Sequence, residues 1–341
     1  MIYACTMVLL LDGQTSMDFW RVVYPENREL LKPPCSAPNP PYAVSAENAW
    51  LLAPSWLTTE YLDRGAHVLG VLTSGGRCAR RHSQTHKAHS WSKGFPSGSF
   101  YDLENGVFVS SPCFIFLQMA SVLSLPELVA YGDELCGLYA FDRSAERGIR
   151  KRKHPLITKA QLASFLESAK GHRGSKCAQL ALTYIVEKSA SPMETLDEIL
   201  LCFPYRYGGY AIRVASMNNE VPLDLSARRI AGLQRCYTDI SWPPIKYDIE
   251  HQGKRDHMGE ADFEADRARI NALRIMGFEV IELTHSQVSN WRSFEEIALH
   301  TAKILGHRVP IEKRGLTAKR KLLRKTLYGW NRSYGHKHHD L

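Results

Sequence analysis

Two predicted strands joined by a pair of prolines constrain the fold of this chain more than any other feature. Residues 236–242 and 246–252 each alternate polar and apolar side chains, which is typical of half-buried β-strands. The Pro-Pro turn at 243–244 is so short that the two strands are expected to be antiparallel neighbours. Asp239 on the first strand can then lie across from, or diagonal to, Glu250 on the second.

The second of these strands gathers polar residues on one face. With a period of two, Asp248, Glu250 and Gln252 point to one side of the sheet, and Tyr247 and Ile249 point to the other. Divalent cations take hard oxygen ligands from more than one element, so an ion shared with the neighbouring strand would suit this face. The alternative interpretation is a row of edge-strand polar groups that face water.

On the metal interpretation, the candidate ligands for Mg²⁺ or Mn²⁺ are Asp239, Glu250 and Gln252. Glu194 is a fourth candidate, near the start of a predicted helix, and it is open to two interpretations. It either points toward the ion, or it completes a capping box with Ser191, which would explain the residue without any chemistry.

Three further polar groups have ordinary alternatives. His257 follows the second strand and could orient a water or contact phosphate, but a solvated loop histidine explains it equally well. Asp266 and Arg269 are three apart on a predicted helix, which favours a simple ion pair. The segment 76–89 holds three Arg and three His, and a solvated or phosphate-contacting loop is favoured there over a histidine metal site.

The order of predicted elements indicates an α/β (α+β) fold, with a C-terminal mixed sheet flanked by helices and a smaller mixed α/β domain before it. The predicted C-terminal strands are 210–216, 221–226, 236–242, 246–252 and 278–284. The predicted C-terminal helices are 191–203, 262–277 and 293–305. Strands near the N-terminus and at 67–72, and helices at 113–123, 125–135 and 176–188, are expected earlier in the chain.

A charged break at 143–155 suggests the domain boundary. We therefore expect an N-terminal regulatory or targeting domain at 1–150, a main C-terminal domain at 151–305 and a basic tail at 306–341.

The positive charge of the chain lies in that tail. Residues 306–341 hold 10 Lys or Arg and 2 acids, a net of +8, while residues 1–305 hold 33 of each sign. Leucines at 316, 323 and 327 recur at helical spacing among the cations. The tail is either a solvated basic helix or a contact to nucleic-acid phosphates, with DNA favoured over RNA. The candidate phosphate-binding residues are Lys319, Arg320, Lys321, Arg324 and Lys325.

The composition favours a cytoplasmic protein. None of the eight cysteines forms a C-x-x-C pair, and several lie in apolar runs, as reduced core cysteines do. The apolar N-terminal stretch has no preceding Lys or Arg and no cleavage pattern, so we interpret it as a buried strand. No apolar run approaches the 18 residues of a membrane span, and no membrane partner is expected.

The acidic strands belong to a longer motif. It comprises D-I-S-W-P from Asp239, I-E-H-Q-G around Glu250, D-R-A-R-I-N-A-L at 266–273 and G-F-E-V-I at 277–281. This run resembles the very-short-patch-repair-endonuclease-like domain of the restriction-endonuclease-like PD-(D/E)XK superfamily. The similarity covers roughly residues 189–305 and implies a central mixed sheet flanked by helices.

The resemblance extends to seven residues, among them Asp266 and Arg269, which match a D-x-x-R on the following helix. Asp239 matches the first metal-binding Asp, Glu250 the acidic residue of the E-x-K element and Gln252 its Lys position. Glu194 matches an acidic residue on the first core helix, and His257 matches a histidine that follows the strand. The superfamily chemistry implied for them is Mg²⁺-dependent or Mn²⁺-dependent cleavage of phosphodiesters.

The sequence departs from the family pattern in three places. Gln252 stands where a charged residue is usual, and Asp248 stands where a small or apolar one is expected. The spacer between Gly253 and His257 is longer than the usual two residues.

A second resemblance covers roughly residues 65–140, which look similar to the C-terminal part of the abortive-infection type IV antitoxin family. Two hypotheses follow. In the first, the protein is a bacterial metal-dependent endonuclease acting in phage defence or DNA repair. In the second, the nuclease fold is kept without catalysis, and the protein is an antitoxin-like regulator that binds nucleic acid or a partner.

Overall fold

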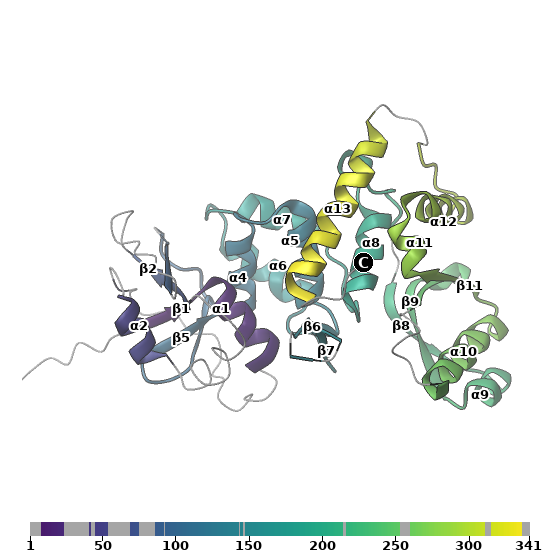
Figure 1. The fold of residues 1–341 in the computed structure, drawn as a ribbon, viewed down its shortest axis with the longest axis horizontal. Coiled ribbons are helices and arrows are strands. Elements are labelled where there is room, and N and C mark those ends of the chain that lie inside the picture. The colour runs from purple at the N-terminus through teal and green to yellow at the C-terminus, as the bar shows by residue number, and fades with distance from the viewer. Residues whose placement is uncertain are drawn as a thin grey trace, which may run out of the picture. The chain divides into compact units, whose positions relative to one another are not determined.

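The computed structural model divides into two compact units (Figure 1). The first comprises residues 1–128 and 156–183, and the second comprises 129–155 and 184–341. This division differs from the single boundary expected near residue 150, because the chain returns to the first unit after it has entered the second. The structure describes residues 8–23, 41, 45–53, 69–74, 86–91, 93–142, 144–145, 147–213, 216–252, 260–310 and 315–335.

A mixed sheet of five strands, in the order β3-β2-β1-β5-β4, forms the centre of the first unit. The central pair, β1 and β5, is parallel, while β1–β2 and β4–β5 are antiparallel and β2–β3 is parallel. Every residue of β1 is buried, as the apolar N-terminal run predicted. The strands are β1 (Leu9–Leu11), β2 (Leu69–Thr73), β3 (His86–Ser90), β4 (Phe100–Asp102) and β5 (Val107–Ser110).

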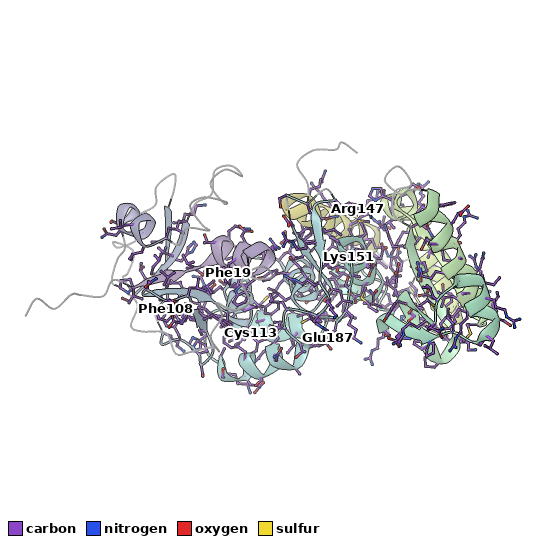
Figure 2. All side chains as sticks on the ribbon, turned by 90° about the horizontal axis from the view of Figure 1, so that it is seen from below. Phe19, Phe108, Cys113, Arg147, Lys151 and Glu187 are labelled. Atoms are coloured by element: carbon purple, nitrogen blue, oxygen red, sulfur yellow. The ribbon has the colours of Figure 1, made fainter. Side chains whose placement is uncertain are left out.

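Short helices accompany this sheet: α1 (Gly13–Asp18), the π-helical turn η1 (Phe19–Val23), α2 (Ala46–Leu52), α4 (Pro112–Met119), α6 (Lys159–Ser168) and α7 (Ser175–Leu182). α1 packs against α4, and Figure 2 labels Phe19 and Cys113 at the starts of η1 and of α4. A capping box opens α6, with reciprocal bonds between Thr158 and Gln161. α7 ends six residues before the end of the helix predicted at 176–188.

Segment 156–183 belongs to the first unit because its helices pack on α4. The rings of Phe114 in α4 and Phe165 in α6 lie 6.5 Å apart, and both side chains are buried. Lys93 donates a hydrogen bond of 2.8 Å to the carbonyl of Gly171. The charge run at 143–155 belongs to the second unit, and the apolar contacts beyond it decided the partition.

The second unit contains a four-stranded mixed sheet in the order β11-β10-β9-β8. β9 pairs antiparallel with both β8 and β10, as the proline-linked strands predicted, and β10 pairs parallel with β11. A separate hairpin, β6 (Tyr139–Phe141) and β7 (Ile149–Lys151), follows α5 (Leu125–Leu135). The sheet strands are β8 (Ser216–Pro222), β9 (Arg235–Trp242), β10 (Tyr247–Gln252) and β11 (Glu279–Thr284).

Helices flank this sheet, which confirms the predicted fold class. On one face, Tyr247 contacts Thr301 of α12 through their hydroxyls and His251 contacts Asp197 of α8. On the other face, α10 and α9 enclose an apolar cluster that includes Ile270, Leu273 and Val280. The helices are α8 (Pro192–Cys202), α9 (Leu225–Ala231), α10 (Glu260–Ile275), α11 (His285–Ser289) and α12 (Trp291–Ile304), with short 3₁₀ turns η5 (Tyr205–Tyr207) and η6 (Pro243–Ile245).

The strand predicted at 221–226 was wrong. β8 ends at Pro222, and Asp224 then caps α9 by accepting a hydrogen bond of 2.8 Å from the amide of Ala227. The V-P-L-D-L-S segment alternates apolar and polar residues as a strand does. The same alternation arises here because the polar Asp224 caps a short helix. The described part of the strand predicted at 210–216 joins β8 only at Ser216.

The basic segment after residue 305 is part of the core of the second unit. α13 (Leu316–Gly335) lies along α8 (Figure 1), and it also packs against η5. Its leucines at 316, 323 and 327 are buried, and the Trp330 ring lies 5.0 Å from the ring of Phe141. The helical spacing of the leucines therefore marks the apolar face with which α13 packs against the rest of the second unit.

Among the described residues, no helix is long and apolar enough to cross a membrane. The cysteines at 113, 177 and 236 are free thiols. Burial raises the pKa of the Cys113 thiol to about 12, which keeps it protonated at neutral pH.

Candidate acidic site on the second sheet

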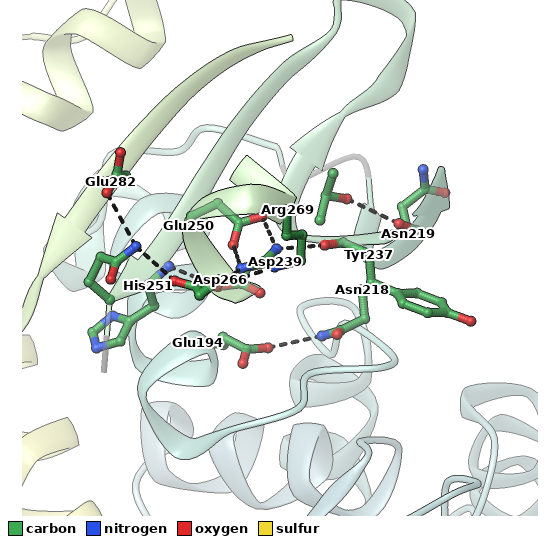
Figure 3. A network of polar contacts seen from close by, with 12 residues as sticks. Glu194, Asn218, Asn219, Tyr237, Asp239, Glu250, His251, Asp266, Arg269 and Glu282 are labelled. Atoms are coloured by element: carbon green, nitrogen blue, oxygen red, sulfur yellow. Dashed lines mark hydrogen bonds and ion pairs between the residues drawn. The ribbon is translucent and has the colours of Figure 1, made fainter. Parts of the chain in front are cut away.

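The two acidic residues singled out in the sequence lie on adjacent strands of one sheet. The β9–β10 register pairs Ile240 with Ile249, and continuing it by one residue sets Asp239 opposite Glu250. Directly opposite residues of an antiparallel pair share a face, so both carboxylates belong to the same side of the sheet. Figure 3 shows these residues with their polar neighbours.

Glu250 is held by a guanidinium. Arg269 of α10 donates from Nη1 to Oε1 of Glu250 at 2.9 Å and from Nη2 to Oε2 at 2.7 Å, a two-pronged fork (Figure 3). The Glu250 side chain is 1% exposed and that of Arg269 is 23% exposed. A fork of this kind, with both carboxylate oxygens bonded, is the strongest geometry for such a pair. The neighbouring carboxylates raise the pKa of Arg269 although burial opposes this, so the guanidinium stays charged.

The same guanidinium has two more partners. Nη2 of Arg269 also donates to Oδ1 of Asp266 at 2.7 Å, and Nη1 donates to the carbonyl oxygen of Tyr237 at 2.9 Å. The simple helical pair expected between Asp266 and Arg269 is therefore present, but it is one part of a bridge between α10 and β10. Arg269 is the residue whose importance the sequence understated, and its D-x-x-R spacing was the available signal.

Asp239 lies within this acidic group but has a different environment. Its Oδ2 accepts a hydrogen bond of 2.8 Å from the backbone N–H of His251, and among the described residues no cation pairs with it. Burial, together with the charges of Glu250 and Glu194, raises the pKa of Asp239 well above its ordinary value. The charges of Glu250 and Glu194 therefore both act against ionisation of Asp239.

Asp248 is the most enclosed member of the group. Its side chain is 0% exposed, and in the described part of the chain neither carboxylate oxygen meets a hydrogen-bond donor. Burial, followed by the charge of Glu250, raises the pKa of Asp248 to about 11. Enclosure without a donor therefore favours the protonated, neutral form of this carboxyl group.

Glu194 satisfies both interpretations made from the sequence. The hydroxyl of Ser191 accepts from the amide of Glu194 at 3.1 Å, so Ser191 caps α8 as expected. The Glu194 carboxylate in turn accepts from the amide of Ala190 at 2.8 Å and from Nδ2 of Asn218 at 2.9 Å (Figure 3). Burial raises its pKa against the effect of these hydrogen bonds.

Asn218, which no sequence pattern indicated, positions Glu194 from the edge strand. Its backbone is left-handed, with φ of 44°, a conformation that Asn tolerates better than most residues. Nδ2 of Asn218 also donates to the carbonyl of Lys188 at 2.9 Å, which ties β8 to the segment preceding α8. Strained backbone of this kind often accompanies functional sites.

Gln252 lies on the expected face, but its contacts run through the amide nitrogen. Nε2 donates to Oδ2 of Asp266 and to Oε2 of Glu282, each at 3.3 Å. Glu282 is also paired with Arg274 at 2.8 Å. Gln252 therefore links two carboxylates at the rim of the acidic group, a contact different from the ligand role expected for its carbonyl oxygen.

A second buried pair lies on the other face of β10. Nδ1 of His251 is 2.6 Å from Oδ2 of Asp197 on α8, and both side chains are almost fully enclosed. Burial alone would lower the pKa of His251, but the Asp197 carboxylate outweighs it and raises that pKa. The sequence placed His251 only as the middle residue of E-H-Q and did not indicate its partner.

The acidic group matches the oxygen chemistry of a divalent cation. Oxygen-rich side chains come from three elements, and the two orphaned oxygens of Asp248 lie next to Glu250. Over the ranges that the structure describes, however, no three His, Cys, Asp or Glu side chains are spaced to hold an ion. Both Glu250 oxygens face the guanidinium of Arg269 instead.

The candidate phosphate-binding residues of the basic segment separate into two groups. Lys319, Lys321 and Lys325 are exposed on α13. Arg320 and Arg324 are buried, so their assignment to phosphate contacts is corrected. Arg320 pairs with Glu295 and lies 4.3 Å from the Tyr210 ring centre, and Arg324 donates to the carbonyl of Val288. Helical periodicity puts residues three or four apart on one face, here the same face as the leucines.

Two predictions fall partly or wholly outside the described residues. His257 lies outside them, and so does most of the segment 76–89. The described end of that segment is strand β3, where Nδ1 of His89 is 2.8 Å from Oδ2 of the buried Asp12.

Comparisons with protein-family models, with curated proteins and with solved structures return no match to this chain. The resemblance to the repair-endonuclease-like family stays a prediction, and the residues around Asp239 and Glu250 carry it.

Proposed function

We propose that the second unit is a divalent-metal-dependent endonuclease that cleaves nucleic-acid phosphodiesters in the bacterial cytoplasm, with DNA favoured as the substrate. The observation that supports this most is the position of Asp239 of β9 opposite Glu250 of β10 on one face of the sheet, with the charge of Glu194 from α8 acting on Asp239. Three mutually repelling acids from three elements are costly to bury unless protons or a cation compensate them. The resemblance of the motif points in the same direction.

In this proposal, Asp239 and Glu250 hold Mg²⁺ or Mn²⁺, and Gln252 assists at the rim. Glu194 adds negative charge beside Asp239 and is kept in place by Asn218. His257 contacts water or phosphate. When bound, the ion would stabilise charge on the scissile phosphate and lower the pKa of the attacking water.

A second candidate function is a non-catalytic regulator that binds nucleic acid or a partner through the same fold. The observation that favours it is the fork of Arg269 on Glu250, which already neutralises the central carboxylate. Protein-supplied cations of this kind can stabilise a fold without any reaction.

Nicking of supercoiled plasmid by the full chain in Mg²⁺ or Mn²⁺ separates the two functions. The nuclease proposal expects nicking that Asp239→Asn and Glu250→Gln each reduce by at least ~100-fold, a loss of about 2.7 kcal/mol in transition-state stabilisation. Glu279→Gln is the matched control, since Glu279 lies on the next strand, β11, and is paired with His300 at 3.2 Å. That variant should keep its activity.

Absence of nicking in both metals, with DNA binding unchanged between parent and variants, would favour the regulator. Nicking that survives Glu250→Gln would also contradict the proposed site.

A further inference from the structure

We propose that Arg269 is an internal competitor of the divalent cation: its guanidinium occupies the cation position at Glu250, and an ion binds when Arg269 withdraws to Asp266. This inference rests on the proposed function, because it concerns access to the same acidic group. It assigns a gating role to a side chain that the sequence presented as half of an ordinary ion pair.

The contacts of Arg269 define the two positions. In the observed one, Nη1 and Nη2 hold both oxygens of Glu250 at 2.9 and 2.7 Å, which leaves neither oxygen directed at another cation. Asp266, three residues earlier on the same helix, already holds Nη2 at 2.7 Å and Nε at 3.3 Å. Because these atoms share one guanidinium, Arg269 can release Glu250 and keep Asp266 without losing all of its charge compensation.

The surroundings favour release toward Asp266. The Asp266 side chain is 22% exposed, while that of Glu250 is 1% exposed, so a guanidinium moved outward gains hydration. Glu250 left behind would be a buried, unpaired charge, which is a strongly unfavourable state unless another cation replaces the guanidinium. Ion entry and arginine withdrawal are therefore expected to be coupled.

An independent observation points to a ligand at this place. Asp248 is fully buried beside Glu250, and neither of its oxygens has a donor among the described residues. The Arg269 fork does not reach Asp248, so this oxygen pair is left over in the arrangement that the guanidinium satisfies. A divalent ion, with more ligand positions than a guanidinium fork, would use such oxygens.

Calorimetric titration of the full chain with Mn²⁺ alone tests the inference without any nuclease assay. Arg269→Gln should bind Mn²⁺ roughly tenfold more tightly than the parent, or bind it measurably where the parent does not, because the competing charge is gone. Arg269→Lys keeps the charge without the fork and should fall between them. If Arg269→Gln does not fold, Arg269→Lys and the Mn²⁺-induced rise of its melting temperature provide the same test.

Arg274→Gln is the matched control, because Arg274 lies on the same helix and pairs with Glu282 of the same sheet at 2.8 Å. The Mn²⁺ affinity of this variant should equal that of the parent. If Arg274→Gln tightened Mn²⁺ binding as much as Arg269→Gln, the effect would come from the lost positive charge alone, and the inference would be overturned. Asp266→Asn should weaken Mn²⁺ binding in the parent and have no effect in the Arg269→Gln background.

Equal Mn²⁺ affinity in the parent and both Arg269 variants would also overturn the inference. Tighter Mn²⁺ binding by Arg269→Gln without nicking by any variant would keep the inference and refute the proposed nuclease. Nicking by the parent together with unchanged Mn²⁺ affinity in Arg269→Gln would support the proposed nuclease and refute the competition by Arg269.

Discussion

At Asp248, burial disfavours the charged carboxylate, and no hydrogen-bond donor among the described residues compensates for it. The folded protein keeps a proton on this group that the unfolded chain releases, since the pKa rises from the ordinary 3.8 to about 11. The stability from this proton is fully present below pH 3.8 and is lost as the pH rises through that window. The free energy of unfolding is therefore expected to fall as the pH rises from 4 to 8.

Asp248→Asn should remove this pH dependence, because the amide has the shape of the protonated acid and is neutral at every pH. We expect the variant to be more stable than the parent at pH 8 and to have no advantage at pH 4. Urea unfolding at pH 4, 6 and 8 in EDTA measures the difference, with Glu282→Gln as a partly exposed control. Parallel stability profiles of parent and Asp248→Asn would show that Asp248 is ionised in the folded protein.

At the scale of elements, α13 shows how one helix can be cationic and still belong to a core. Its buried face carries leucines and Trp330, and its arginines at 320 and 324 cross that face to reach carbonyl, carboxylate and aromatic partners. Long arginine stems pack as apolar surface while their guanidinium groups stay bonded.

Adjacent leucines of α13 provide a matched test of this role. Leu323 is 2% exposed and Leu322 is 64% exposed. Leu323→Ala should lower the free energy of unfolding by about 2–5 kcal/mol, whereas Leu322→Ala should change it by no more than about 0.5 kcal/mol. Urea titrations of the two variants measure this. Similar small losses in both would mean that α13 is not part of the folded core.

At the scale of the whole molecule, the net charge of +8 lies in the segment that contains α13. Removing that segment would also remove core packing, so truncation after Leu305 cannot isolate a charge effect. The exposed lysines at 319, 321 and 325 can be changed without disturbing the buried face.

Replacing these three lysines by Gln should flatten the salt dependence of DNA binding. If each contacts one phosphate, the slope of log K against log salt should fall by about 0.9 per residue, roughly 2.7 in all. Fluorescence anisotropy with a short duplex at several salt concentrations measures the slope. Gln replacement of Lys151, Lys153 and Lys176, all exposed elsewhere, is the control of equal charge. An identical slope in both triple variants would assign the binding to overall charge.

The sequence by itself determined the features that depend on near neighbours. The Pro-Pro turn and the alternation around it were enough to predict that β9 and β10 pair antiparallel, with Asp239 across from Glu250. The caps at Ser191 and Thr158 were also readable, because a helix start involves residues only three apart.

Only the tertiary structure decided which partners these residues take. Arg269 is 19 residues from Glu250, and no spacing rule covers a fork between a helix and a strand. The same holds for the return of 156–183 to the first unit and for the burial of Arg320 and Arg324 on α13. Such contacts depend on how apolar faces pack over long chain separations, and a charge pattern along the sequence does not report which cations the packing encloses.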